Sequence, residues 1–113
     1  MEIICTHNNA DFDAVAAMLA AHKLYPQAVP VLPERLNRNV SEFITLYQNG
    51  LPFVSWEDVR RPSIARLILV DTQRLPAIDE LTDSVPVLII DHHPLEREPA
   101  SNVTFTGETV GAA

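Results

Sequence analysis

The stretch Leu67-Ile68-Leu69-Val70-Asp71 decides the fold, because four consecutive apolar residues run directly into a carboxylate. A continuous apolar run of this length is typical of a strand in a parallel sheet that is covered on both faces. Val85–Ile90 has the same character, and Glu2–Thr6 is a similar short run near the amino terminus. We therefore expect these three segments to be central, parallel strands.

Segments with helical spacing separate these strands. Asp13–Leu24 is predicted to be a helix that stops before Pro26, and Asn39–Asn49 to be a second helix capped by Asn39. Ala28–Leu32 lies between prolines and is expected to be a strand near the edge of the sheet. The alternation predicts an α/β fold, with a mostly parallel open sheet and helices on both faces.

Length and composition limit the classes of protein to which the chain can belong. The chain has 113 residues, is 47% hydrophobic and carries a formal net charge of −7, which suits one small folded domain. The acidic balance argues against a protein that holds nucleic acid mainly through a basic surface, but a short or end-bound nucleic-acid substrate remains compatible with it. No apolar run reaches the roughly 20 residues that cross a bilayer, and no signal-peptide pattern is present. We expect a cytoplasmic protein without a membrane partner, and an inert, buried Cys5.

Acids and histidines follow all three predicted central strands. The first strand continues into Thr6-His7-Asn8-Asn9-Ala10-Asp11-Phe12-Asp13, the second into Asp71, and the third into Asp91-His92-His93. The carboxyl ends of parallel strands meet at one edge of a sheet, where ligand sites form. We therefore expect these side chains to converge at that edge.

Converging carboxylates repel one another, and a bound divalent cation supplies the compensating charge. Carboxylate and imidazole ligands without a thiolate favour manganese, magnesium or iron-type ions over a structural zinc. Two ions sharing a bridging carboxylate, about 3.5–4 Å apart, form the usual clamp for displacement at a phosphate ester. The pattern thus predicts metal-dependent phosphate-ester chemistry.

Other interpretations exist for the individual residues. A single aspartate at a strand end is usually a turn residue or a helix cap, so only the joint pattern predicts a site. A receiver-like signalling domain also gathers strand-end aspartates around magnesium, but it gives no role to His7 or to Asp91-His92-His93. Arg35–Arg38 precedes a helix and is placed to contact phosphates, with a solvated loop as the alternative. The aromatic residues are expected to be core rather than a stacking platform: Phe43, Tyr47, Phe53 and Trp56.

Three of these motifs resemble one family. His7-Asn8-Asn9-Ala10-Asp11-Phe12-Asp13-Ala14 resembles the first motif of the DHH family, His-x-x-x-Asp-x-Asp-Ala, and Val70-Asp71 resembles the second. Asp91-His92-His93 resembles the signature that names the family. The family contains RecJ-like exonucleases, nanoRNA and cyclic-dinucleotide phosphodiesterases, and manganese-dependent pyrophosphatases. The resemblance implies a Rossmann-like phosphoesterase domain that acts on a nucleotide or a short single-stranded nucleic acid.

The resemblance also implies roles for single residues and a cofactor of two divalent ions, Mn²⁺ first and Mg²⁺ second. It implies that His7 and Asp11 bind one ion, that Asp13 and His92 bind the second, and that Asp71 bridges both ions. It also implies that Asp91 orients a neighbouring histidine and that His93 faces the substrate phosphate. Arg38 is the candidate substrate-binding residue outside these motifs.

One branch of the family is the most similar. Thr6–Ala17 and Gly107–Ala113 resemble DHH domains fused through CBS domains to tRNA nucleotidyltransferase or poly(A) polymerase modules. The family's fourth acidic motif and its DHHA1 domain do not occur in residues 1–113, and the stretch from Phe105 resembles the start of a further helix. We therefore expect a partial DHH domain that lacks its downstream domains, binds metal weakly and hydrolyses little by itself. A catalytically inactive nucleotide-binding or scaffolding module is the alternative.

Overall fold

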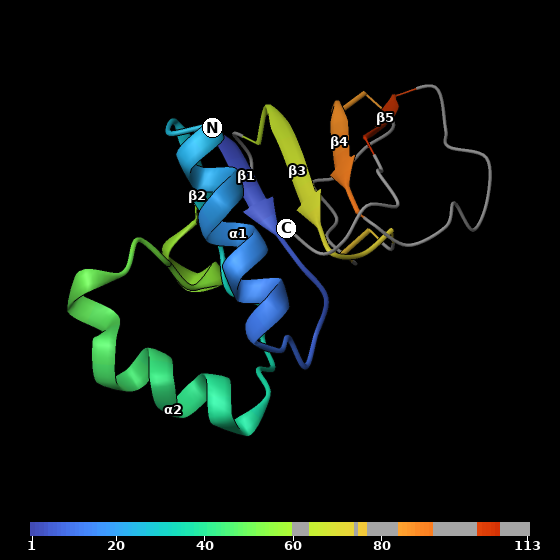
Figure 1. Ribbon diagram of the computed structural model, residues 1–113. Coiled ribbons are helices and arrows are strands. Elements are labelled where there is room, and N and C mark those ends of the chain that lie inside the picture. Colours follow the sequence, from blue (N-terminus) through green and yellow to red (C-terminus); the bar gives the residue numbers. More distant parts are fainter. Residues whose placement is uncertain (60–63, 74, 77–83, 92–101, 107–113) are drawn as a thin grey trace.

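The computed structural model describes residues 1–59, 64–73, 75–76, 84–91 and 102–106 (Figure 1). The elements follow in this order: β1 (Glu2–Cys5), α1 (Phe12–Leu24), β2 (Ala28–Pro30), α2 (Arg38–Tyr47), the 3₁₀ helices η1 (Gln48–Gly50) and η2 (Trp56–Asp58), β3 (Arg66–Val70), β4 (Val87–Ile90) and β5 (Val103–Thr106). The predicted strands and helices are therefore present, with ends that differ by a few residues.

The strands form one five-stranded sheet in the order β2-β1-β3-β4-β5, and every pairing is parallel. This confirms the predicted α/β class, and it confirms that β2 lies at an edge. The chain passes from β1 to β2 on one side and then returns to β3 on the other side of β1. In a doubly wound sheet of this order, ligands bind where the direction of winding reverses, at the carboxyl ends of β1 and β3.

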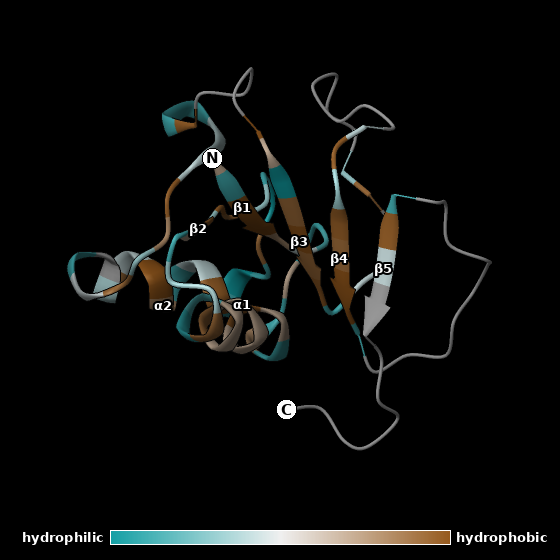
Figure 2. Cartoon of the chain, turned by 90° about the horizontal axis from the view of Figure 1, so that it is seen from above, coloured by the Kyte–Doolittle hydropathy of each residue, from teal (hydrophilic) through white to brown (hydrophobic). Residues whose placement is uncertain are grey.

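Both faces of the sheet are apolar because consecutive residues of each strand point to opposite sides. Ile68 belongs to the face that packs against Met18 of α1, whereas Leu67 and Leu69 belong to the opposite face, which packs against Val59 and Trp56 near η2. Figure 2 shows the hydrophobic colour along β3 and β4. Complete burial of one large aliphatic side chain stabilises the fold by about 1.5–3 kcal/mol.

Helix α1 begins at Phe12, one residue before the predicted start, and ends at Leu24 as predicted. Asp11 is its N-cap, with extended backbone and a side chain that accepts a hydrogen bond from the Ala14 N–H. The Tyr25 N–H donates to the Ala21 carbonyl at the carboxyl end, just before Pro26. The apolar side of α1 therefore lies on the sheet, and its amino end lies beside the end of β1.

Helix α2 begins one residue earlier than predicted, and its cap is a different asparagine. The Asn39 N–H donates to Oδ1 of Asn37 at 2.9 Å, so Asn37 provides the cap and the prediction for Asn39 was wrong. The Asn37 N–H donates to the Ala10 carbonyl, which fixes the extended chain up to this residue. Asn37 and Asn39 are both suitable cap residues, and the hydrogen bond between Asn37 and Ala10 determines that Asn37 is the cap.

Two further predictions need correction. Phe43 is 39% exposed and Tyr47 is 56% exposed, so neither ring is core, although Phe53 and Trp56 do pack against the hydrophobic clusters. Phe105 lies in β5 and not in the start of a helix, because Val103–Thr106 pairs with β4. Residues 107–113 lie outside the described part of the chain.

Within the residues described here, the structure has no helix that combines the length and the apolar character needed to span a membrane.

Candidate metal centre

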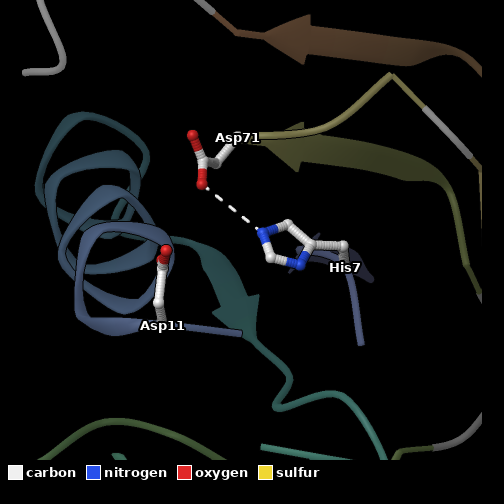
Figure 3. A group of neighbouring side chains, drawn as sticks. All are labelled: His7, Asp11 and Asp71. Carbon is white, nitrogen blue, oxygen red and sulfur yellow. Dashed lines mark ion pairs between the residues drawn. The ribbon is translucent and has the colours of Figure 1, made fainter. Parts of the chain in front are cut away.

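Three of the predicted metal ligands meet at the carboxyl edge of the sheet. His7 follows β1, Asp71 directly follows β3, and Asp11 caps α1 (Figure 3). One nitrogen of His7 and one oxygen from each carboxylate all lie within 4.8 Å of one another. The group therefore forms at the point where the winding of the sheet reverses.

The imidazole of His7 is held in one orientation. Its Nδ1 lies 2.9 Å from the Asn8 carbonyl oxygen, and its Nε2 lies 3.5 Å from Oδ2 of Asp71. Because a carbonyl only accepts, Nδ1 carries the proton in this contact. A protonated Nε2 would pair with the Asp71 carboxylate, whereas an Nε2 without a proton would offer a lone pair to a cation shared with that carboxylate.

Asp71 has an unusual backbone. Its φ of 57° lies in the left-handed region, which non-glycine residues rarely occupy. The Asp71 N–H donates to the Ile90 carbonyl at 3.0 Å, so pairing with the end of β4 holds this conformation. The side chain is 13% exposed and faces His7. Such strained conformations are frequent at functional sites, where the surrounding structure maintains them.

The two aspartates of the first motif differ in position. Asp11 is exposed, caps α1 and also contributes an oxygen to the three-residue group. Asp13 is exposed in the first turn of α1 and is not a member of that group. The structure thus brings together His7, Asp11 and Asp71, and the role of Asp13 stays a prediction.

The end of β4 contributes a buried carboxylate. Asp91 is 4% exposed and accepts a hydrogen bond from Nε2 of Gln73 at 3.0 Å. Its predicted partners His92 and His93 lie outside the described residues. The Gln73 contact links the loop after β3 to the end of β4, and it was not predicted, although Gln73 stands only two positions after Asp71.

Two supporting residues were also missed. The Thr6 hydroxyl donates to the Val70 carbonyl at 2.8 Å in a buried contact, which ties the end of β1 to the end of β3. The Asn8 side chain accepts from the Arg35 N–H at 3.3 Å, which joins the His7 loop to the segment before α2. Thr6 and Asn8 are polar residues on either side of His7, and this position in the chain is the only feature of the sequence that indicates a supporting role.

Arg38, the candidate substrate-binding residue, begins α2. Its guanidinium lies 3.6 Å from Oε1 of Glu42, and its side chain is 92% exposed. An ion pair exposed to this degree contributes little to stability. Arg38 is therefore accessible to a ligand, and its role in binding stays a prediction.

The geometry of the three-residue group is close to that of a site for one divalent ion. Two ligands of the same ion lie no further apart than twice the metal–ligand distance, which is about 4–5 Å for bonds of about 2.0–2.5 Å. For Mg²⁺, whose bonds are about 2.0–2.1 Å, the limit is about 4.2 Å, so the three atoms, which lie within 4.8 Å of one another, would have to move closer to bind this ion together. One imidazole and two carboxylates suit manganese or magnesium.

Comparisons with known proteins agree with the motifs. Residues 2–113 match the model of the DHH family, N-terminal domain. An A-adding tRNA nucleotidyltransferase of Geobacter sulfurreducens is 40% identical over 100 residues, and one of Aquifex aeolicus is 29% identical over 94 residues. Each alignment covers 83% of this chain but only 11% of the relative, so the chain spans about one ninth of those proteins. The chain belongs to the DHH family, whose N-terminal domain it matches from Glu2 to its last residue.

Proposed function

We propose that this chain is the metal-binding part of a phosphoesterase domain that hydrolyses phosphodiester or phosphate-ester bonds of nucleotides or short nucleic acids. The observation that carries the proposal is the convergence of His7, Asp11 and Asp71 within 4.8 Å at the carboxyl edge of the sheet. DHH-family membership supports the reaction class, because this family generally consists of phosphoesterases.

The proposed ligands extend beyond this group. His7 and Asp11 would hold one ion and Asp71 would bridge to a second, to which Asp13 and His92 would contribute. Mn²⁺ is the proposed ion and Mg²⁺ the substitute. When bound, such ions supply positive charge to the phosphoryl oxygens and favour the ionisation of water.

Neighbouring residues of the chain hold the proposed ligands in position. The contact of Nδ1 with the Asn8 carbonyl leaves Nε2 as the His7 atom that would bind the ion. Pairing of β3 with β4 holds Asp71 in position, and the hydrogen bond from Gln73 orients Asp91. Asp91 would in turn orient a neighbouring histidine, and His93 would face the substrate phosphate.

We further propose that the domain belongs to a larger protein that acts on RNA. Both relatives named above are A-adding tRNA nucleotidyltransferases, and the chain matches 11% of their length. The remaining ligands and the far wall of the substrate cleft would then come from other parts of the protein. We expect the 113-residue chain alone to bind metal weakly and to hydrolyse little.

Titration with MnCl₂ in a calorimeter tests the metal site. Wild type is expected to bind Mn²⁺, and Asp71→Asn to lose this binding while keeping its fold. Glu57→Gln removes one negative charge from an exposed position of η2 and is the matched control, which should bind as wild type does. Absence of Mn²⁺ binding in the wild type would defeat the enzyme proposal and favour an inactive module.

Hydrolysis is tested separately with a dinucleotide substrate. The isolated chain should release little product with Mn²⁺, whereas a longer protein that contains it should release product and lose this activity with Asp71→Asn. Robust turnover by residues 1–113 alone would contradict the proposal that further ligands are required.

A further inference from the structure

A buried hydroxyl joins the two chain segments that carry His7 and Asp71. The Thr6 hydroxyl donates to the Val70 carbonyl at 2.8 Å, and Thr6 is 8% exposed. Thr6 directly precedes His7, and Val70 directly precedes Asp71. The hydrogen bond therefore lies one residue away from each of two candidate metal ligands.

This hydrogen bond lies just beyond the paired residues of β1 and β3. The register of the two strands ends with Cys5 opposite Leu69, and Thr6 and Val70 are the next residue of each segment. The side-chain hydroxyl thus joins the two segments one step past the last residue pair. It does so at the point where the chain leaves β1 to form the loop that carries His7.

The pairing of the strands does not depend on this hydroxyl. Four residue pairs join β1 to β3, and Ile4 and Ile68 in the middle of the strands are fully buried. An apolar residue at position 6 would suit a segment that only packs, because a buried hydroxyl carries a desolvation cost that an apolar side chain does not. The position of the Thr6 hydroxyl beside the candidate ligands therefore indicates its role.

Other contacts orient each ligand but do not join the two segments. Nδ1 of His7 contacts the carbonyl of the adjacent Asn8, and the Asp71 N–H donates to the Ile90 carbonyl at the end of β4. The first contact lies within the β1 segment, and the second joins β3 to β4. The hydrogen bond from the Thr6 hydroxyl links the β1 segment to the β3 segment.

The separation of this ligand pair already suits a shared ion. Nε2 of His7 lies 3.5 Å from Oδ2 of Asp71, and the two side chains face each other in Figure 3. Two ligands of one Mg²⁺ ion lie no more than about 4.2 Å apart, since each bond is about 2.0–2.1 Å long. The pair whose segments Thr6 joins therefore needs no closer approach to bind one ion.

We propose that Thr6 is a positioning residue of the candidate metal centre, and that its hydroxyl holds the segments of His7 and Asp71 at the separation at which both side chains bind the same divalent ion. This rests on the proposed function and adds to it a residue outside the ligand set. Substitution of residues that support metal ligands typically lowers metal affinity about 10- to 100-fold. Because Thr6 acts through the backbone, we expect the lower end of this range.

Mn²⁺ binding to the 113-residue chain tests the role of Thr6, with the electron paramagnetic resonance signal of free Mn²⁺ as the measure of affinity. Thr6→Val replaces the hydroxyl with a methyl group and should weaken binding by about tenfold. Thr6→Ser keeps the hydroxyl and should bind as wild type does. A residue needed only for packing would show the opposite order, because valine preserves the shape of threonine and serine does not.

Two further comparisons separate positioning from a general loss of stability. Thr6→Ser and Thr6→Ala differ only in the hydroxyl, so the serine variant should bind Mn²⁺ about tenfold more tightly than the alanine variant. Ile3→Val removes one methyl group from a fully buried residue of the same strand, and it should lower the unfolding temperature but bind Mn²⁺ as wild type does. Thermal unfolding without metal, followed by circular dichroism, measures the stability of each variant.

The outcomes distinguish the role of Thr6 from the proposed function. Binding by Thr6→Val and Thr6→Ala equal to that of wild type would overturn the role of Thr6 and leave the proposed function intact. Equal weakening by Thr6→Ser and Thr6→Ala, or by Ile3→Val, would also overturn it, as would failure of Thr6→Val and Thr6→Ala to fold, since the sheet would then require the hydroxyl. Absence of Mn²⁺ binding in the wild type would instead contradict the proposed function itself.

Discussion

Strand β3 and helix α2 carry similar amounts of apolar side chain but use it differently. Leu67, Ile68 and Leu69 of β3 are completely buried, whereas on α2 Val40 is buried and Phe43 and Leu46 remain exposed. Every apolar residue of β3 therefore contributes to stability. Val40 and Ile44 of α2 also pack in a hydrophobic cluster, whereas Phe43, Leu46 and Tyr47 are not members of the clusters in the described part of the chain.

The largest effect is expected from truncating the centre of β3. Ile68→Ala removes a fully buried side chain that packs in the cluster with Met18 of α1. We expect the free energy of unfolding to fall by about 3–4 kcal/mol, from lost burial and from the cavity left behind. Urea unfolding followed by circular dichroism measures the change, and a loss below about 1 kcal/mol would mean that the face under α1 is loosely packed.

A pH effect in β1 is the second largest. Burial raises the pKa of the Cys5 thiol from 9.0 to about 12. Above pH 9 the unfolded chain therefore releases this proton while the folded chain retains it, so this contribution to stability is complete below pH 9 and is lost as the pH rises toward 12. Between pH 8 and 10.5 we expect wild type to lose about 2 kcal/mol relative to Cys5→Ala.

Urea unfolding of both proteins at a series of pH values measures this difference, and the comparison with Cys5→Ala cancels the titration of tyrosines and lysines. A difference that does not vary with pH would show that water reaches the thiol. The result sharpens the contrast with α2, because Cys5 is 3% exposed in the same sheet as β3.

A smaller effect is expected at the boundary between core and site. At position 71 the φ of 57° favours glycine over any residue with a Cβ atom. Asp71→Gly should therefore be more stable than Asp71→Ala by about 1 kcal/mol, in reverse of the usual order. Thermal unfolding without metal measures this difference, and equal stabilities would show that the loop relaxes once the carboxylate is removed.

The sheet and the meeting of three candidate ligands were predictable because both follow from strand pattern and strand order. The continuous apolar run before Asp71 identified a central strand, and parallel strands place their carboxyl ends at one edge. The left-handed conformation of Asp71 was not predictable, since it depends on pairing with the Ile90 carbonyl.

Elements that depend on distant neighbours were predicted less well. Helical spacing placed Phe43 and Tyr47 on one face of α2, but spacing does not reveal whether another element covers that face. In Val103–Thr106, valine and phenylalanine alternate with threonine, which is a pattern that suits a strand. The segment from Phe105 was nevertheless predicted to be the start of a helix. Its pairing with β4 decided the outcome, and such pairing is not encoded locally.

The smallest effect is expected on α2 itself. Leu46 is 78% exposed, so Leu46→Ala should change the free energy of unfolding by no more than about 0.5 kcal/mol, despite removing as many side-chain carbons as Ile68→Ala. Urea unfolding at two protein concentrations measures both the effect and its origin. A loss comparable to that of Ile68→Ala, together with a dependence on concentration, would show that copies of the chain cover this face. The contrast between β3 and α2 would then reflect a second copy of the chain on α2 and not a permanently exposed helix face.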